Sequence, residues 1–370
     1  MTASRLRSVR IVGAGLLGAS VGLALREAGV DTVLDDTNST AVDLAVTYGA
    51  GRPSDAGDTP ELIVVAVPPA SVAAVVIDEL ARYPHAIVTD VASVKTGILQ
   101  QIRAAGGDLQ RYVGSHPMAG RERGGAMSAR ADLFEGRPWV ITSDEQTAPD
   151  AIALVRDLAV ALGATSVQLT AEEHDRSVAI VSHAPQIVAS LLAARLGDAP
   201  TASIALAGQG LRDTTRIAAS DAELWVQILE ANAAPVAEVL RAYRDDLDAV
   251  IASLDAPGRP GATADTDADA SRGIAAALAA GNAGVARIPG KHGTARRFQQ
   301  LIIKVDDTPG ELARLLSEIG DEGVNIEDLR LEHSPGAAVG FVEVSVLPEV
   351  AHGLATALVR RGWGLAEEDQ

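Results

Sequence analysis

The chain has 370 residues, of which 47% are hydrophobic and 22% are charged, and its formal net charge is −18. This length exceeds a typical single domain, and the composition is that of a soluble globular protein with enough apolar residues for packed cores. The acidic balance argues against nucleic acid and anionic membrane surfaces as partners, because both select for clustered Lys and Arg. No cysteine is present, which excludes disulfides, cysteine-ligated zinc and thiol catalysis.

The N-terminal residues resemble the start of a folded domain rather than a targeting signal. Arg5, Arg7 and Arg10 are followed by a strand pattern that runs into glycines, and not by the apolar segment and cleavage site of a signal peptide. No apolar run reaches the roughly 20 residues needed to span a bilayer. The sequence therefore predicts a cytoplasmic protein without membrane contacts.

Short apolar runs alternate with helical patterns from residue 9 to about 165. Strands separated by helices of this kind indicate βαβ units, so we expect an α/β domain with a mainly parallel sheet over residues 8–170. The strands are expected at Val9–Val12, Thr32–Leu34, Leu62–Val67, Ala86–Thr89, Tyr112–Gly114, Trp139–Thr142 and Ser166–Leu169.

Strand patterns are missing after residue 171, where Ala- and Leu-rich helical patterns dominate. We expect long helices over Arg176–Leu196 and Ala222–Leu254, within an all-α domain spanning residues 171–285. Their apolar faces need more covering surface than one helical domain supplies, which predicts a homodimer. The Gly- and Pro-rich stretch 255–297 is expected to hold only a short helix, Ser271–Ala280, and residues 286–297 to form a linker.

Residues 298–370 show the order strand, helix, strand, strand, helix, strand, which is that of small ferredoxin-like βαββαβ modules. The strands are expected at Phe298–Val305, Asp321–Val324 and Gly340–Val346, with a last one near Trp363–Ala366.

A glycine-rich motif follows the first predicted strand and opens a helix, which is the setting in which G-x-G-x-x-G binds a dinucleotide. Gly13 permits the tight turn, Gly15 lets the backbone approach the pyrophosphate, and Gly18 lets the helix pack closely on the sheet. The N–H groups at the start of the helix then face the anion. The predicted cofactor-binding segment is Gly13, Ala14, Gly15, Leu16, Leu17 and Gly18.

Two aspartates end the next predicted strand, about 20 residues beyond the glycines. A carboxylate in this place accepts hydrogen bonds from the adenosine ribose and repels a 2′-phosphate, so we expect NAD as the cofactor. We choose Asp36, which begins the following loop, and Asp35 remains the alternative.

Further candidate site residues follow other strands. Val67 and Pro68 end a buried strand and are expected to face the nicotinamide side of the cleft. Ser93 follows the strand Ala86–Thr89, and His116 lies between Ser115 and Pro117 at another strand end. We expect His116 to be catalytic rather than simply solvated.

The chain resembles the prephenate/arogenate dehydrogenase family of tyrosine biosynthesis over almost all of residues 9–254. Ser115-His116-Pro117-Met118-Ala119-Gly120 with the downstream Gly124-Gly125 is highly specific to that family, whereas the glycine motif is shared by all dinucleotide-binding dehydrogenases. The matching segments are Val12–Ser20, Val88–Lys95, Gly114–Gly125, Val181–Pro185 and Gly210–Trp225.

This resemblance implies an NAD-dependent oxidoreductase that oxidises and decarboxylates prephenate to 4-hydroxyphenylpyruvate. Prephenate carries a ring hydroxyl opposite a ring carboxylate, and a pyruvyl side chain. His116 would take the hydroxyl proton, for which an imidazole pKa near ~6.5 is suitable. Ser93 would hydrogen-bond the imidazole or the reacting hydroxyl, and Arg216 would hold the side-chain carboxylate in a bidentate fork.

The resemblance also implies roles for residues of the helical domain. His183 would reach the cleft from that side, and Asp213 would support Arg216 from an i,i+3 position. Glu122 would gate the pocket ionically, and Trp225 would form a wall of the site. The segment Ser182-His183-Ala184-Pro185-Gln186 has glutamine where the family commonly has a second histidine, which puts any role of that position in doubt.

The C-terminal module resembles the ACT domain through Asp306-Asp307-Thr308-Pro309-Gly310-Glu311-Leu312. Pro309 would start a helix, and Gly310 would let a ligand approach backbone N–H groups. The resemblance implies an amino-acid effector, tyrosine, which Asn325 would meet across a paired interface. The alternative is a dimerisation module that binds nothing.

Three other functions are weighed against prephenate oxidation. An arogenate dehydrogenase would make tyrosine directly from the amino analogue of prephenate. A β-hydroxyacid dehydrogenase relies on a lysine of the helical domain, and the lysines here are Lys95, Lys291 and Lys304, all outside the predicted long helices. A non-catalytic regulator that binds NAD and an amino acid is disfavoured by the intact set Ser93, His116, His183 and Arg216.

Overall fold

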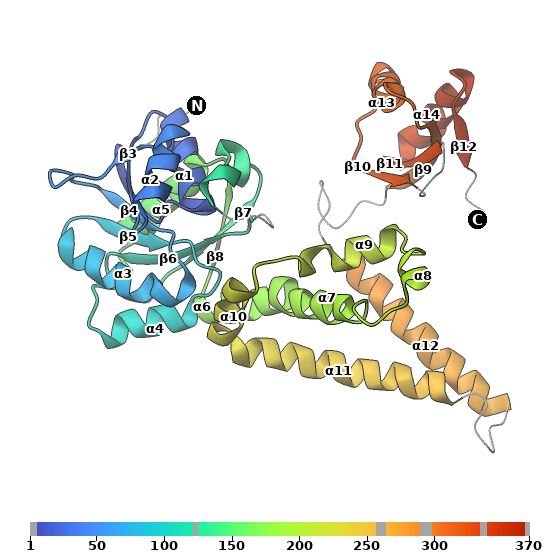
Figure 1. The fold of residues 1–370 in the computed structure, drawn as a ribbon, viewed down its shortest axis with the longest axis horizontal. Coiled ribbons are helices and arrows are strands. Elements are labelled where there is room, and N and C mark those ends of the chain that lie inside the picture. Colours follow the sequence, from blue (N-terminus) through green and yellow to red (C-terminus); the bar gives the residue numbers. More distant parts are fainter. Residues whose placement is uncertain (1–5, 121–124, 257–263, 289–297, 334–338, 367–370) are drawn as a thin grey trace. The chain divides into compact units, whose positions relative to one another are not determined.

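The computed structural model describes residues 6–120, 125–256, 264–288, 298–333 and 339–366 (Figure 1). The chain divides into two compact units. One comprises Met1–Ala199 with Thr214–Tyr243, and the other comprises Pro200–Asp213 with Arg244–Gln370.

An eight-stranded sheet is the framework of the first unit, with the strand order β3-β2-β1-β4-β5-β6-β7-β8. All neighbouring strands are parallel except β6 and β7. The first six have the order of a doubly wound dinucleotide-binding sheet, whose ligand site lies where the order reverses, between β1 and β4. The strands are β1 (Ser8–Val12), β2 (Asp31–Asp35), β3 (Arg52–Pro53), β4 (Leu62–Val65), β5 (Ile87–Asp90), β6 (Tyr112–Pro117), β7 (Pro138–Thr142) and β8 (Thr165–Leu169).

The mainly parallel sheet and its seven predicted strands are confirmed, and the two-residue strand β3 was too short to predict. Within the described residues, five α-helices and two short 3₁₀ turns connect the strands. They are α1 (Leu16–Glu27), α2 (Ser39–Thr47), α3 (Pro69–Arg82), α4 (Thr96–Ala104), η1 (Ala126–Ser128), η2 (Ala131–Phe134) and α5 (Pro149–Ala161).

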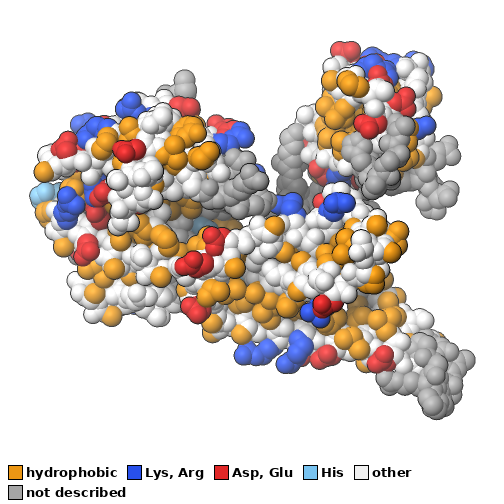
Figure 2. Space-filling view, in the orientation of Figure 1, with side chains coloured by type: hydrophobic (Ala, Val, Ile, Leu, Met, Phe, Trp, Pro, Cys, Tyr) orange, Lys and Arg blue, Asp and Glu red, His pale blue; other side chains and the backbone are white. Residues whose placement is uncertain are grey.

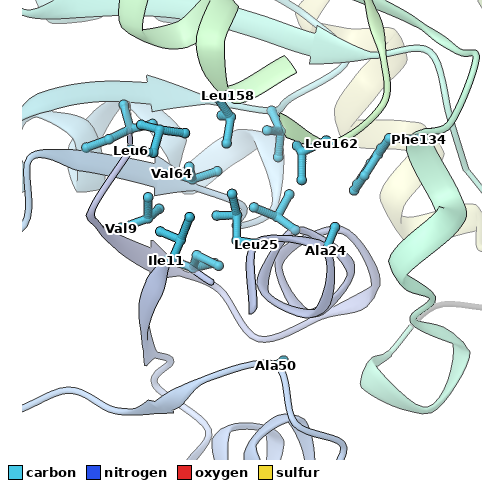
Figure 3. Close-up of a cluster of buried hydrophobic side chains, with 14 of the residues drawn as sticks. Leu6, Val9, Ile11, Ala24, Leu25, Ala50, Val64, Phe134, Leu158 and Leu162 are labelled. Atoms are coloured by element: carbon cyan, nitrogen blue, oxygen red, sulfur yellow. The ribbon is translucent and has the colours of Figure 1, made fainter. Parts of the chain in front are cut away.

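The sheet is buried on both faces. Ile11 of β1 packs with Leu25 of α1 and Leu158 of α5 in one cluster (Figure 3). Ile63 of β4 belongs to a second cluster, in which it packs with Val76 of α3. All five side chains are fully buried. Burial on both faces explains why the central strands are continuous apolar runs rather than alternating ones.

A continuous helical run follows the last strand, formed by α6 (Ala171–Val178), the π-helical turn η3 (Ala179–His183) and α7 (Ala184–Ala194). It starts at a capping box, in which Thr170 accepts a hydrogen bond from the Glu173 N–H and the Glu173 carboxylate accepts one from the Thr170 N–H. The predicted helix Arg176–Leu196 is thus confirmed, with an earlier start. Pro185 has no N–H to donate into the preceding turn, which favours the irregular π-helical geometry there.

By length and composition, the run Ala171–Ala194 is apolar enough to cross a membrane. This differs from the expectation that no such run exists. The core helix of a soluble protein passes the same test, and this run carries buried polar side chains at His174, Asp175 and His183. We therefore interpret it as a helical run of the first unit whose start, α6, packs against α4 and β7 of the sheet domain.

The predicted single helix Ala222–Leu254 is wrong, because two helices replace it. α10 (Ala222–Ala231) ends at Asn232, and α11 (Ala233–Asp255) begins directly afterwards. The interruption leaves the Asn232 side chain buried, where it forms two hydrogen bonds. The shorter elements before α10 are α8 (Thr201–Ile204), α9 (Gln209–Thr215) and η4 (Arg216–Ala218).

The prediction for residues 255–297 is also wrong in extent. A 22-residue helix, α12 (Ala264–Val285), occupies most of a stretch in which only a short helix was expected. Alanine has the highest helix propensity, and the alanines of this segment outweigh its three glycines. Of the predicted linker 286–297, residues 289–297 lie outside the described residues.

The C-terminal part of the second unit contains a four-stranded antiparallel sheet with the order β10-β11-β9-β12. The strand–helix order is the predicted βαββαβ. The predicted strand Asp321–Val324 is wrong: α13 ends at Asp321, and Gly323, with φ of +68°, forms the following turn. The elements are β9 (Gln299–Asp306), α13 (Glu311–Asp321), β10 (Asp328–His333), β11 (Val339–Val346), α14 (Pro348–Arg360) and β12 (Gly364–Ala366).

Candidate active site

The glycine motif forms the loop between β1 and α1, as predicted. Gly13 has φ of +108°, and a Cβ atom there would lie 2.4 Å from the Ala66 carbonyl oxygen. A Cβ atom on Gly18 would lie only 1.8 Å from the Gly13 carbonyl oxygen. Both positions therefore need glycine to bring the loop, the helix and the end of β4 together.

Gly15 differs from these two glycines because a Cβ atom there would meet nothing within 4 Å. It is the N-cap of α1, and no side chain caps the helix at that point. The free N–H groups of the first helical turn therefore border open space. This combination suits a diphosphate, which needs both close backbone approach and the positive end of a helix.

The two candidate carboxylates at the end of β2 have different partners. Asp35 forms an ion pair with Arg10, whose buried guanidinium also donates to Glu79 at 2.9 Å. Asp36 accepts hydrogen bonds from the Ala14 N–H at 2.7 Å and from the Asn38 N–H at 2.8 Å. The structure thus places Asp36 against the glycine loop, while Asp35 is neutralised by an arginine.

Val67 and Pro68 lie between β4 and α3, on the same edge of the sheet as the glycine loop. Ser93 lies in the loop between β5 and α4 and is half-buried. His116 is the fifth residue of β6 and is also half-buried. The carboxyl ends of β1, β4, β5 and β6 point the same way, so the first unit gathers these residues along one sheet edge.

His116 is the first member of a chain of three hydrogen-bonded side chains. Its Nδ1 lies 2.9 Å from Nε2 of His174, and the two rings meet edge to face with centroids 5.1 Å apart. His174 Nδ1 in turn lies 2.8 Å from Oδ1 of Asp175. Both His174 and Asp175 are on α6 and are buried.

The Asp175 carboxylate also caps α4. Its Oδ1 accepts a hydrogen bond from the Lys95 N–H at 2.9 Å, and its Oδ2 accepts one from the Thr96 N–H at 2.8 Å. A carboxylate at a helix N-terminus is stabilised by the free N–H groups and by the positive end of the helix dipole. Asp175 thereby ties α6 to the loop that carries Ser93.

A buried ion pair holds the other end of this loop. Asp90 pairs with the Lys95 ammonium, and both side chains are at most 1% exposed. Asp90 also accepts hydrogen bonds from the Tyr112 hydroxyl at 2.8 Å and from the Ala92 N–H at 2.9 Å. The backbone carbonyl of Asp90 accepts one from Ser115. The loop 91–95 is thus fixed at both ends by buried charges.

His183 lies on the π-helical turn η3 and is 1% exposed. The Asn232 amide donates to its Nδ1 at 3.0 Å and also to the Asp175 carbonyl at 2.8 Å. An amide nitrogen only donates, so His183 carries its proton on Nε2. The Trp225 ring meets the His183 ring edge to face at 5.9 Å. The structure therefore brings together the predicted His183 and Trp225.

The imidazoles of the site are kept uncharged. Burial lowers the pKa of His116 well below 6.5, and the neighbouring His174 and Lys95 lower it further. Burial also lowers the pKa of His174, against the attraction of Asp175. It lowers the pKa of His183 to about 4. For Asp175, burial raises the pKa, but the hydrogen bonds from His174, Thr96 and Lys95 outweigh it and the net shift is downward.

The remaining predicted site residues are Arg216, Asp213 and Glu122. Arg216 begins η4, which packs against α7, and its side chain is exposed. Asp213 is exposed on α9, in the second unit, and accepts a hydrogen bond from Gln209 at 2.7 Å. Glu122 lies outside the described residues.

Sequence reasoning missed Asp90, Lys95, His174, Asp175 and Asn232. One signal was available, since Glu172-Glu173-His174-Asp175 is a run of titratable residues directly after the last strand of an α/β sheet. For Asn232 the overlooked signal was Pro235, which has no N–H to donate into a continuous helix and so favours a break just before it.

Models of two protein domains match this chain. The one described as prephenate dehydrogenase, nucleotide-binding domain, matches residues 21–168, and the one described as prephenate dehydrogenase, dimerization domain, matches residues 170–261. A Streptomyces niveus protein named a probable prephenate dehydrogenase is 36% identical over 362 residues, which cover 97% of this chain and 99% of that relative. The Bacillus subtilis prephenate dehydrogenase is 24% identical over 354 residues, 91% of each chain.

Two solved structures share the fold. A prephenate dehydrogenase from A. aeolicus, solved in complex with hydroxyphenyl propionate and NAD+, has a TM-score of 0.66 at 23% identity and covers 76% of this chain and 97% of its own. A Synechocystis arogenate dehydrogenase has a TM-score of 0.60 at 27% identity and covers 75% of this chain and 99% of its own.

The lowered pKa of His183 predicts a pH-dependent loss of stability. Below pH 6.5 an unfolded chain protonates this imidazole, whereas the folded chain keeps it neutral down to pH 4. Protons therefore favour unfolding in this window, and His183 costs up to about 3 kcal/mol as the pH falls from 7 to 4. We expect His183→Gln to lose less stability than the wild type over this range, as measured by urea unfolding at both pH values. The exposed His85→Gln variant is the control and should follow the wild type. Equal losses in all three proteins would contradict the prediction.

Proposed function

Because this chain belongs to the prephenate dehydrogenase family, we propose that it catalyses the oxidative decarboxylation of prephenate to 4-hydroxyphenylpyruvate in tyrosine biosynthesis. The chain is an NAD-dependent oxidoreductase of this family. The observation that carries the proposal is the position of His116, which lies at the carboxyl end of β6 with Nδ1 engaged by His174. Its Nε2 is then the nitrogen that faces a substrate.

The glycine loop fits NAD, since open space lies over Gly15 and no side chain caps α1. Asp36 would accept hydrogen bonds from the adenosine ribose hydroxyls, and Val67 with Pro68 would border the nicotinamide. NAD, when bound, accepts a hydride from the hydroxyl-bearing carbon of the substrate. The pyrophosphate would be held by Gly13, Ala14, Gly15, Leu16, Leu17 and Gly18.

His116 would take the proton of the substrate hydroxyl as the hydride leaves that carbon. The resulting ketone is conjugated to the ring double bonds, through which it is vinylogous to the ring carboxylate. The carbon–carbon bond to this carboxylate then breaks and carbon dioxide leaves. The electron pair of the broken bond completes the aromatic ring. His116 can return the proton to the phenolate oxygen. Ser93, in the loop fixed by Asp90 and Asp175, would hydrogen-bond the imidazole or the reacting hydroxyl.

The residues of the helical domain would hold the remainder of the substrate. His183 carries its proton on Nε2 and so is a hydrogen-bond donor, and Trp225 packs on its ring to form a wall. Arg216 would bind the side-chain carboxylate, with Asp213 as its partner. Glu122 would control entry to the pocket.

Arogenate is the alternative substrate and differs only in carrying an amino group in place of the keto group. The similarity to the Synechocystis arogenate dehydrogenase keeps this reading open. Both substrates present the same hydroxyl to His116, so their discrimination depends on groups near the side chain. The enzyme would work in the cytoplasm, where its soluble substrate and cofactor are found.

The C-terminal sheet would be an ACT domain that binds tyrosine. Its strand order is that of βαββαβ modules, and Gly310 at the start of α13 has φ of +97° with open space at its Cβ position. A ligand could approach the backbone there. Asn325, which donates to Glu327 at 3.3 Å, would contact the ligand across a paired interface.

The helical domain would pair two copies of the chain. Hydrophobic side chains are exposed on the helices after residue 171 (Figure 2), including Ile180, Val181, Leu191 and Val226, each more than half exposed. Soluble monomers rarely leave so many large apolar side chains in water. The match of residues 170–261 to a dimerization domain supports the same reading.

The proposed activity predicts NADH formation when the pure protein is mixed with NAD and prephenate. We expect turnover with prephenate to exceed turnover with arogenate, and His116→Gln to lower kcat by about 10²–10⁴-fold because the general base is lost. NAD binding by the variant should stay within a factor of about two. Absorbance of NADH reports the rates, and calorimetry reports NAD binding. Adding tyrosine to the faster reaction tests the ACT assignment, with inhibition as the expected result. A wild-type protein that binds NAD but oxidises neither substrate would refute the proposal.

The glycine loop predicts different outcomes for two matched substitutions. Gly15→Ala should fold normally, since its Cβ meets open space, and should weaken NAD binding by about tenfold or more because the Cβ occupies the place of the pyrophosphate. Gly18→Ala should lower the free energy of unfolding by about 1–3 kcal/mol, because its Cβ collides with the backbone of Gly13. Calorimetry with NAD and urea unfolding measure the two effects. Unchanged NAD affinity in Gly15→Ala would place the cofactor elsewhere.

The dimer proposal predicts that Leu191→Asp weakens self-association. An aspartate on α7 would have to be buried in the interface, so the dimer dissociation constant should rise about tenfold or more. Sedimentation velocity over a range of concentrations measures it. Val160→Asp on α5 is the control, because Val160 is as exposed as Leu191 but lies in the nucleotide-binding domain. Identical sedimentation of wild type and Leu191→Asp would argue against this interface.

A further inference from the structure

The Asp175 carboxylate determines where the proton lies on His174. An ionised carboxylate only accepts hydrogen bonds, and Asp175 already accepts from the N–H groups of Lys95 and Thr96. His174 Nδ1, 2.8 Å from Oδ1, must therefore be the protonated nitrogen. Since the pKa of His174 is lowered by burial, the ring is neutral and its Nε2 is unprotonated.

The same reasoning passes from His174 to His116. His174 Nε2 is a hydrogen-bond acceptor, and it lies 2.9 Å from Nδ1 of His116. His116 must therefore donate through Nδ1. A neutral His116 has one proton, so its Nε2 is left with a lone pair.

We propose that His174 and Asp175 are positioning residues, which hold His116 in the tautomer that has its proton on Nδ1 and its acceptor nitrogen, Nε2, toward the substrate. The nature of the proton that Nε2 accepts rests on the proposed function. The tautomer itself does not, because it follows from the hydrogen-bond chain between two neutral imidazoles.

The position of the charges around the chain supports this role. Lys95 and Asp90 form their own ion pair, so the Asp175 carboxylate is left to the imidazoles and to the start of α4. When Nε2 of His116 takes a proton, the resulting imidazolium donates through Nδ1 toward His174 and Asp175. The negative charge of Asp175 stabilises that cation through the intervening His174.

The tautomer of His183 is also set by a hydrogen bond, but here the proton lies on Nε2 and not on Nδ1. Asn232 donates to Nδ1 of His183 and so leaves Nε2 as a donor. The same Asn232 amide holds the backbone carbonyl of Asp175. One buried cluster therefore sets one imidazole to accept a hydrogen bond and a second to donate one, without a charge on either ring.

The tautomer can be read directly by NMR of the protein with ¹⁵N-labelled histidine and bound NAD, near pH 7.5. We expect Nδ1 of His116 to show the ¹⁵N shift of a protonated nitrogen and Nε2 that of an unprotonated one, with the signals assigned from their loss in His116→Gln. Asp175→Asn should weaken this preference, because its amide offers one oxygen in place of the two that accept from His174 Nδ1 and from the N–H groups of Lys95 and Thr96. A wild-type His116 protonated on Nε2 would overturn the proposal.

Kinetics test the consequence. Asp175→Asn should lower kcat by about 10²–10⁴-fold, as expected when a general base is no longer held in the productive tautomer, with little change in the KM for NAD. Glu172→Gln is the matched control, since it removes one negative charge from the exposed side of the same helix, and it should leave both tautomer and kcat unchanged.

A second pair of variants separates the effect on the tautomer from the weakened α4 N-cap, because Asp175→Asn changes both. His174→Leu should lower kcat strongly, and His174→Gln should restore part of the rate, because its amide oxygen can accept from Nδ1 of His116. Equal rates for these two variants, or a wild-type rate in Asp175→Asn, would overturn the role. If the wild type oxidises neither prephenate nor arogenate, the proposed function fails while the NMR result still decides the tautomer.

Discussion

The carboxylate of Asp175 is the contact on which the site depends. It is buried, and removing an ionised carboxylate from water costs several kcal/mol unless its oxygens find donors. The donors here come from two segments: the first N–H groups of α4 and the His174 imidazole. Asn232 adds a hydrogen bond to the backbone of the same residue. The helices that follow the sheet are thereby tied to the loop between β5 and α4. This attachment places the His174 imidazole of α6 next to the His116 imidazole of β6.

A second buried charge, Asp90, completes the support. Asp90 ends β5, and Lys95 directly precedes α4 as its N-cap, so their ion pair closes the short loop between strand and helix. Ser93 lies in the middle of this loop and needs no strong contact of its own to be held in place. The two aspartates therefore divide the work: Asp90 determines the shape of the loop, and Asp175 determines how the loop meets the helical domain.

What could be predicted from sequence depended on how far apart the cooperating residues lie in the chain. The glycine loop and the setting of His116 are local, because each motif follows its own strand and contains the residues it needs. Asp175 acts on Lys95 across 80 positions and Asn232 acts on Asp175 across 57, and no local pattern records such pairs. The helix error at Asn232 has a different cause, because a local signal was present. Pro235, three residues after Asn232, has no N–H to donate to the Ala231 carbonyl and so favours the break that ends α10, and the buried partners of Asn232 add to it.

In the proposed mechanism the site attracts an acidic substrate and also accepts a proton from it, and one charged group cannot do both. The chain is strongly acidic, and prephenate is a diacid, so long-range electrostatics oppose binding. A protonated histidine would attract the substrate but could not accept its proton. Burial resolves this conflict by keeping His116, His174 and His183 neutral, so that in the proposed mechanism an arginine such as Arg216 attracts the substrate and His116 accepts its proton. Neutral imidazoles are useful only if the correct nitrogen faces the substrate, and in the proposed arrangement that choice is made by hydrogen bonds from His174, Asp175 and Asn232.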